Sequence, residues 1–182
     1  MRRNLGKNLV FPPLPVVVIG TYDKTGKANA MTAAWSTIYD FGQVFVSVSK
    51  HKTTKNIQLN KCFTLAFATK ATIKMTDYFG LVSGDKQDKI ARAKAHVVKS
   101  NCINAPIITE YPLTLECKLK SLKGGNLIGD IVNVSVDEKY MSGNKILIDK
   151  MQIVTYDMTD HSYRVIGKRI AKGFEVGMSL KK

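Results

Sequence analysis

The sequence has few of the residues from which metal sites and disulfide frameworks are built. Its 182 residues include three cysteines and three histidines. The cysteines form no CxxC pair, and the histidines are too far apart for a metal-ligand motif. An odd, widely spaced set of cysteines also argues against a disulfide framework, and we interpret Cys62 and Cys117, which lie inside apparent strands, as small hydrophobic residues. We therefore expect no metal site and no disulfide.

Long hydrophobic runs are also missing. No apolar stretch approaches the roughly 20 residues that span a bilayer. The first one, after Leu9, is interrupted by Pro12, Pro13 and Pro15, and no small-residue cleavage site follows it. We expect no membrane segment, no signal peptide and a cytoplasmic location. The length and the 45% hydrophobic content predict a single domain, residues 1–182, with its own core.

Acidic residues are scarce relative to basic ones: 14 Asp and Glu stand against 28 Lys and Arg, a net charge of +14. Such an excess raises the alternative of a nucleic-acid-binding protein. Only five of the basic residues are arginine, the residue preferred for bidentate phosphate and base contacts. A diffuse lysine surface favours solubility and the steering of anionic small molecules or acidic proteins. We do not expect nucleic-acid binding.

Apolar runs with the period of β-strands are the main pattern in the chain. They predict strands at 16–22, 30–35, 44–49, 63–68, 113–121, 131–136, 152–155 and 163–166. Helices are expected only at 53–60, 85–95 and, more briefly, 75–79. Closely spaced strands with few helices between them predict a mainly β fold, an antiparallel Greek-key barrel with a few short helices.

A cluster of basic and hydroxyl residues comes directly before the predicted helix 53–60. The first N–H groups of a helix have no intrahelical partner and, with the helix dipole, form an anion site. The alternative is an ordinary N-cap with a solvated charge run. The position at the end of a strand favours a phosphate site. Its candidate residues are Ser47, Ser49, Lys50, His51, Lys52, Thr53 and Thr54.

The predicted strand 30–35 has unusually small side chains. Small residues weaken a strand unless something approaches its backbone closely, as a flat ring would. Trp35, the only tryptophan, either packs at the rim of such a ring or belongs to the core. With the phosphate cluster, this shelf points to flavin mononucleotide (FMN). The shelf residues are Asn29, Ala30, Met31, Thr32, Ala33, Ala34 and Trp35.

Two glycine-bearing segments complete the motifs. The loop 78–84 ends in Ser83 and Gly84 and is either a pocket wall or a simple helix-ending turn. The segment 124–129 superficially resembles a dinucleotide fingerprint, but a strand follows it, so we interpret it as a hairpin turn. The sequence contains no GxSxG, HExxH or Walker A motif. We expect no catalytic side chain, because a flavin carries its own chemistry.

Taken in order, these motifs resemble the flavoredoxin-like branch of the flavin reductase family. The resemblance extends over residues 9–177 and is carried by segments 16–21, 29–35, 44–49, 51–57, 77–84, 104–108 and 112–117. It implies an FMN-binding split barrel and a homodimer that holds FMN near the subunit interface. It also implies that 167–177 reaches towards the partner's flavin.

The resemblance assigns roles to the site residues as well. It places Asn29, Met31, Thr32, Ala33 and Ala34 along the ring and ribityl chain. The 47–54 cluster would hold the ribityl and phosphate, and Ser83 and Gly84 would close the pocket. Within the family, activity divides between flavin reduction by NAD(P)H and electron carriage to another, here acidic, redox protein. The sequence leaves both open.

Overall fold

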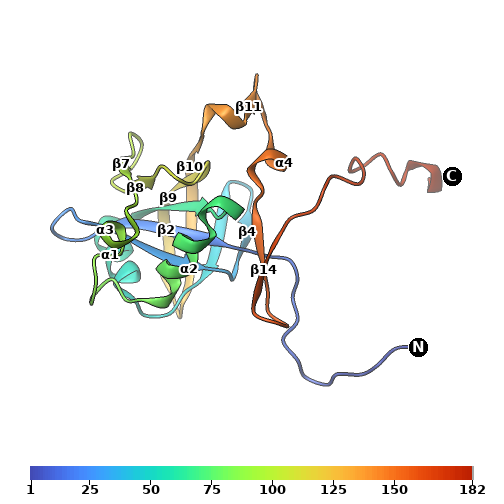
Figure 1. The fold of residues 1–182 in the computed structure, drawn as a ribbon, viewed down its shortest axis with the longest axis horizontal. Coiled ribbons are helices and arrows are strands. Elements are labelled where there is room, and N and C mark those ends of the chain that lie inside the picture. The colour runs from blue at the N-terminus through green and yellow to red at the C-terminus, as the bar shows by residue number, and fades with distance from the viewer. Residues whose placement is uncertain (182) are drawn as a thin grey trace.

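The main element of the fold is one antiparallel sheet that curls into a half-barrel (Figure 1). The computed structural model describes residues 1–181. Its seven strands lie in the order β3-β2-β6-β9-β10-β5-β4. Their bounds are β2 (Val17–Tyr22), β3 (Ala28–Ala33), β4 (Ser36–Asp40), β5 (Gln43–Ser47), β6 (Cys62–Phe67), β9 (Leu113–Lys123) and β10 (Asn126–Val136). The predicted mainly β barrel is confirmed.

Short helices and small sheets surround the half-barrel. The helices are α1 (Lys52–Asn60), α2 (Ile73–Leu81), α3 (Lys89–Ala93) and α4 (Ile148–Met151), with 3-10 turns at Lys70–Thr72, Glu138–Tyr140 and Met178–Leu180. The minor sheets pair β1 (Leu14–Pro15) with β13 (Val154–Asp157) and β14 (Ser162–Val165), β7 (Val97–Lys99) with β8 (Pro106–Ile108), and β11 (Met141–Ser142) with β12 (Lys145–Ile146). No helix within residues 1–181 combines the length and apolarity needed to cross a bilayer.

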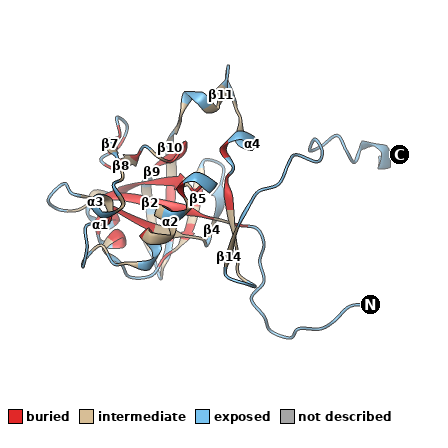
Figure 2. Cartoon of the chain, in the orientation of Figure 1, coloured by how far each residue is buried: buried red, intermediate tan, exposed pale blue. Residues whose placement is uncertain are grey.

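The continuous apolar run of β2 is buried on both faces of the sheet (Figure 2). Val17 and Ile19 point into the half-barrel, where they belong to a core that includes Phe63. Val18 points the other way, into a second core that includes Phe79 of α2. Because adjacent strand residues face opposite sides, a strand covered on both sides reads as an unbroken apolar run. Helix α2 thus covers the outer face of β2, and this packing fixes the position of α2 beside β3.

The glycine-bearing segment 124–129 forms the turn and the start of the long β9–β10 hairpin. Gly124 and Gly125 take positive φ angles of 57° and 85°, as a tight hairpin turn requires. The interpretation as a hairpin turn is therefore confirmed. Gly129 lies further along β10, where a Cβ would come within 2.5 Å of the Phe63 ring. A bare backbone at this point lets the Phe63 ring fill the core.

Several element bounds differ from those predicted. β4 was missed because most of its residues are exposed and lack apolar alternation; among residues 1–181 its one strand pairing is with β5. The helix predicted at 85–95 is the shorter α3, because the Asp88 carboxylate caps Ala91 N–H and Lys94 turns left-handed. β10 begins at Asn126, well before the predicted 131. β3 ends at Ala33, so Trp35 lies in the link to β4.

Both chain ends lie away from the barrel (Figure 1). Residues 1–13 and 166–181 are exposed and pair with no strand within the part of the chain that the structure describes. Large apolar side chains on them are mostly open to solvent: Phe11 is 69% exposed, Ile170 98% and Phe174 102%. Much of the apolar surface of these arms is thus open to solvent.

Candidate functional site

A cavity of about 500 Å³ lies beside the outer strand β3. Within residues 1–181, β3 pairs with β2 alone, and β4, at the opposite end of the sheet, pairs with β5 alone. The curl of the sheet brings these two ends together through the short link at Ala34 and Trp35. The cavity is lined by Asn29, Met31, Thr32, Ala33, Ala34, Trp35, Ser47, Val48, Ser49, His51, Lys52, Thr53, residues 79–84 and Lys89.

All but three of the residues proposed from the sequence line this cavity. Ala30 does not, because the alternation of β3 turns it into the core beneath α2. Lys50 and Thr54 do not either: both line a separate hollow between α1 and the β9–β10 turn. These three residues therefore lie outside the cavity lining, and their role at a ligand stays a prediction.

Thr54 is instead part of the start of α1. Its hydroxyl oxygen accepts the backbone N–H of His51 at 3.0 Å. Since Thr54 is the third residue of the helix, this contact is half of a capping box, which satisfies a backbone donor that the helix leaves free. The ordinary N-cap interpretation therefore holds for Thr54. Thr53, one residue earlier, faces the cavity and accepts a hydrogen bond from Asn29 Nδ2 at 2.9 Å.

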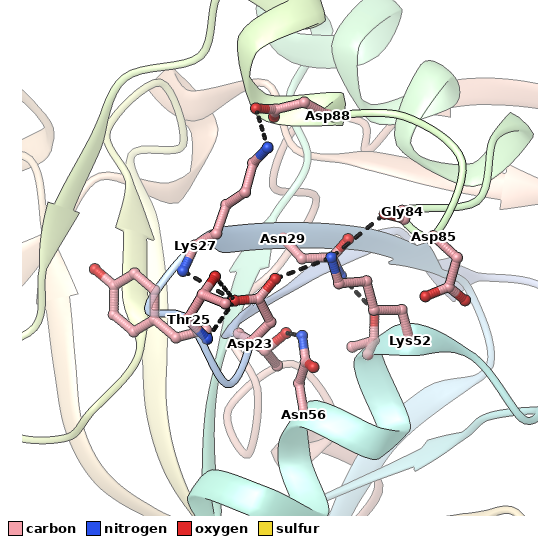
Figure 3. A network of polar contacts seen from close by, with 12 residues as sticks. Asp23, Thr25, Lys27, Asn29, Lys52, Asn56, Gly84, Asp85 and Asp88 are labelled. Atoms are coloured by element: carbon pink, nitrogen blue, oxygen red, sulfur yellow. Dashed lines mark hydrogen bonds and ion pairs between the residues drawn. The ribbon is translucent and has the colours of Figure 1, made fainter.

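Lys52, the first residue of α1, has a defined position at one end of the cavity (Figure 3). Its ammonium lies 3.1 Å from Asp23 Oδ2 and donates to the Gly84 carbonyl at 3.4 Å. Gly84 packs closely against the side chains of Asn29 and Lys52. A Cβ at this position would overlap the Asn29 amide and lie 3.4 Å from Lys52 Cδ. Ser83 and Gly84 thus form part of the cavity wall at this end.

Lys89 of α3 is a second cation in the lining, and the sequence reasoning missed it. Its side chain is buried, and its ammonium donates to the carbonyls of Phe79 at 2.9 Å and Val82 at 3.1 Å. These carbonyls lie at the C-terminal end of α2, where a cation is favoured. Burial, with the nearby charge of Lys52, lowers the pKa of Lys89 to about 8. Its position in the sequence, shortly after Ser83 and Gly84, was the signal that could have identified it as a lining residue.

The rest of the lining is suited to a flat ring. Met31, Val48 and Leu81 give apolar surface, while Ala33 and Ala34 leave the β3 backbone open to approach. Trp35, 50% exposed, lies at the rim rather than in the core. The Thr32 hydroxyl donates to the Thr76 carbonyl, which ties β3 to α2.

The charges of the lining favour an anion at one end. Lys52 and Lys89 both contribute ammonium groups, and the free N–H groups at the start of α1 add to them. Among residues 1–181, none that lines the cavity is Asp or Glu. The donor set therefore fits a planar, partly apolar ligand that carries a terminal phosphate.

Comparisons with known proteins agree with this geometry. The model of the flavin reductase like domain matches residues 12–155. The structure is similar to that of the flavoredoxin of Desulfovibrio vulgaris (Miyazaki F), with 30% identity, a TM-score of 0.93 and coverage of 97% of this chain and 100% of that one. It is also similar to the flavoredoxin from Methanosarcina acetivorans, with 32% identity, a TM-score of 0.89 and coverage of 99% and 100%.

Among sequence relatives, the uncharacterized protein YddH of Escherichia coli (strain K12) is 25% identical over 170 residues, which is 87% of this chain and 90% of that protein. The family match spans most of the chain, and it includes β3, α1 and α2, the elements that form the cavity. The resemblance seen in the sequence motifs is confirmed: the chain belongs to the flavin reductase-like family of flavin-dependent redox proteins.

Proposed function

We propose that the protein is an FMN-dependent oxidoreductase. The observation that carries this proposal is the cavity lining, in which an apolar shelf along β3 leads to an end with two lysines and no carboxylate. FMN has this distribution of properties: a flat ring at one end and a phosphate at the other. The flavoredoxin neighbours support a redox role of the same type.

In this proposal each part of the lining has a task. The β3 backbone, unpaired on its outer side, hydrogen-bonds the polar edge of the ring. Ser47, Ser49 and Thr53 provide hydroxyls for the ribityl chain and the phosphate, and Lys52 and Lys89 offset the phosphate charge. Bound FMN supplies the hydride and electron chemistry, which no side chain of the cavity has to perform.

The proposed electron donor is NAD(P)H, with electron carriage for an acidic redox protein as the alternative. Net charge of +14 favours the approach of either anionic donor. Anaerobic titration of the FMN-loaded protein with NADH and NADPH separates the two activities. Bleaching of the flavin absorbance identifies a reductase. Bleaching only by a reduced acidic redox protein identifies a carrier, and no bleaching by any donor contradicts a redox role.

The first prediction is selectivity for FMN among flavins. Because the cationic end of the cavity is suited to one terminal phosphate, FMN should bind more tightly than riboflavin, which lacks it, and than FAD, which extends beyond it. Isothermal titration calorimetry with the three flavins at one ionic strength measures this. Equal affinities for all three would contradict the proposed phosphate site.

We also propose a homodimer. Exposed apolar side chains occur on β4, where Ile38 is 68% exposed, on the turn after β4, where Phe41 is 101% exposed, and on both chain ends. Apolar surface of this extent usually marks an interface, and homo-oligomers are most often twofold dimers. Light scattering should therefore return about 40 kDa, twice the 20.2 kDa chain. Phe41→Asp should shift the protein towards the monomer, and a monomer of the unmodified protein at micromolar concentration would contradict the proposal.

A further inference from the structure

The turn between β2 and β3 carries a carboxylate that pairs with the lysine proposed at the phosphate end of the cavity. Asp23 follows the last residue of β2, and its Oδ2 atom lies 3.1 Å from the Lys52 ammonium (Figure 3). Asp23 does not itself line the cavity. The ion pair therefore connects this hairpin turn, from outside the cavity, to Lys52 of the cavity lining.

Asp23 is held in place by its own turn. Its Oδ1 atom accepts hydrogen bonds from Thr25 N–H at 2.9 Å, the Thr25 hydroxyl at 2.6 Å and Lys27 N–H at 3.1 Å. The Thr25 hydroxyl bond is the main cause that holds the pKa of Asp23 well below its usual range. The carboxylate is thus charged and oriented, with its second oxygen left for Lys52.

A fixed partner restricts the flexible side chain of Lys52. A lysine side chain has several rotatable bonds, and it loses more conformational freedom on ordering than most side chains. Here the ion pair is partly sheltered, since the side chains of Lys52 and Asp23 are 22% and 15% exposed. The Gly84 carbonyl provides a second contact for the ammonium of Lys52, a residue of the cavity lining.

We propose that Asp23 is a positioning residue that orders Lys52 at the phosphate end of the cavity before the ligand arrives. The inference rests on the proposed function, in which Lys52 faces the phosphate of FMN. Two effects of the carboxylate oppose each other: it orders the lysine, and it offsets part of the positive charge that attracts the phosphate. If Asp23 is a positioning residue, the gain from ordering Lys52 exceeds the loss of positive charge. Removal of the carboxylate should then weaken FMN binding.

The test is Asp23→Asn, which keeps the size of the side chain and removes its charge. Ordering one flexible side chain on binding costs enough to expect FMN affinity about threefold to tenfold weaker. Riboflavin affinity should not change, since it has no phosphate. In a Lys52→Met background, Asp23→Asn should have no further effect on FMN. Thr25→Val, which keeps the charge but removes the orienting hydroxyl, should give a smaller loss with the same selectivity.

The chain provides a matched control in the β13–β14 turn. Asp157 Oδ1 accepts from Thr159 N–H at 2.9 Å and from the Thr159 hydroxyl at 2.6 Å, and its Oδ2 pairs with Arg164 Nε at 2.9 Å. This turn lies outside the cavity lining. Asp157→Asn should therefore lower the melting temperature to a similar degree as Asp23→Asn and leave both flavin affinities unchanged.

The outcomes separate the two proposals. Unchanged or tighter FMN binding by Asp23→Asn, or an equal loss of FMN and riboflavin, would overturn the positioning role alone, provided that Lys52→Met weakens FMN selectively. If Lys52→Met spares FMN, the phosphate site fails, and the positioning role is overturned with it. An FMN-selective loss in Asp23→Asn that disappears in the Lys52→Met background establishes the role.

Discussion

Lys52→Met is expected to weaken FMN binding by about tenfold to a hundredfold and to leave riboflavin binding almost unchanged. The substitution keeps the length of the side chain and removes its charge. A charge-assisted hydrogen bond contributes about 1.5–3 kcal/mol, and each 1.4 kcal/mol is a factor of ten in affinity. Calorimetry of both flavins at one fixed ionic strength measures the effect, since salt screens the interaction.

Thr54→Val is the matched control for this prediction. Its hydroxyl bonds the His51 backbone at the start of the same helix and lies outside the cavity lining. Loss of this cap should cost about 1 kcal/mol of folding stability, with equal effects on FMN and riboflavin. Equal weakening of both flavins by Lys52→Met would show that Lys52 supports the helix rather than the phosphate.

FMN affinity is expected to fall as the pH rises from 7 to 9, through the loss of the proton on Lys89. Its pKa is lowered to about 8, so the ammonium is charged below that pH and neutral above it. The charge attracts the phosphate, which is already close to its dianion at pH 7 because its second pKa is about 6. Riboflavin should show no such trend. Lys89→Met should bind FMN weakly at pH 7 and remove the decline in affinity.

The same group should change the stability of the apoprotein in the opposite direction. In the unfolded chain the pKa of a lysine is about 10.4, above the value of about 8 in the folded protein. Between these values the unfolded state binds more protons, so the contribution of Lys89 to folding stability rises with pH. Denaturant unfolding of the apoprotein and of Lys89→Met at pH 7 and 9 isolates this contribution. Parallel trends of affinity and stability would contradict the assignment to Lys89.

The sequence was informative where local pattern and tertiary structure agree. The small residues of β3 and the polar start of α1 each predicted both an element and its place in the cavity, and the apolar run of β2 predicted a buried strand. In each case a residue's chemistry, such as a hydroxyl near a helix start, is meaningful without knowledge of distant segments. The fold class and most of the lining follow from such patterns.

The features that the sequence did not reveal depend on contacts between distant segments. Lys89 reads as a solvated residue among alternating Asp and Lys, and only the packing of α3 on the end of α2 buries it beneath two carbonyls. Thr53 and Thr54 look equivalent in sequence, but the turn of the helix directs one to Asn29 and the other to the capping box. β4 shows no apolar pattern because most of its residues are exposed, and its place in the sheet rests on its pairing with β5.

The one-sided pairing of β3 leaves the ligand-free protein with an open strand edge. A strand with an open edge is a template on which a strand of another chain can add, the first step of aggregation. A ligand seated along that edge blocks this addition and also stabilises the fold by mass action, about 2.7 kcal/mol at a hundredfold excess over the dissociation constant. The yield of intact protein should therefore follow the flavin supply of the cell that makes it.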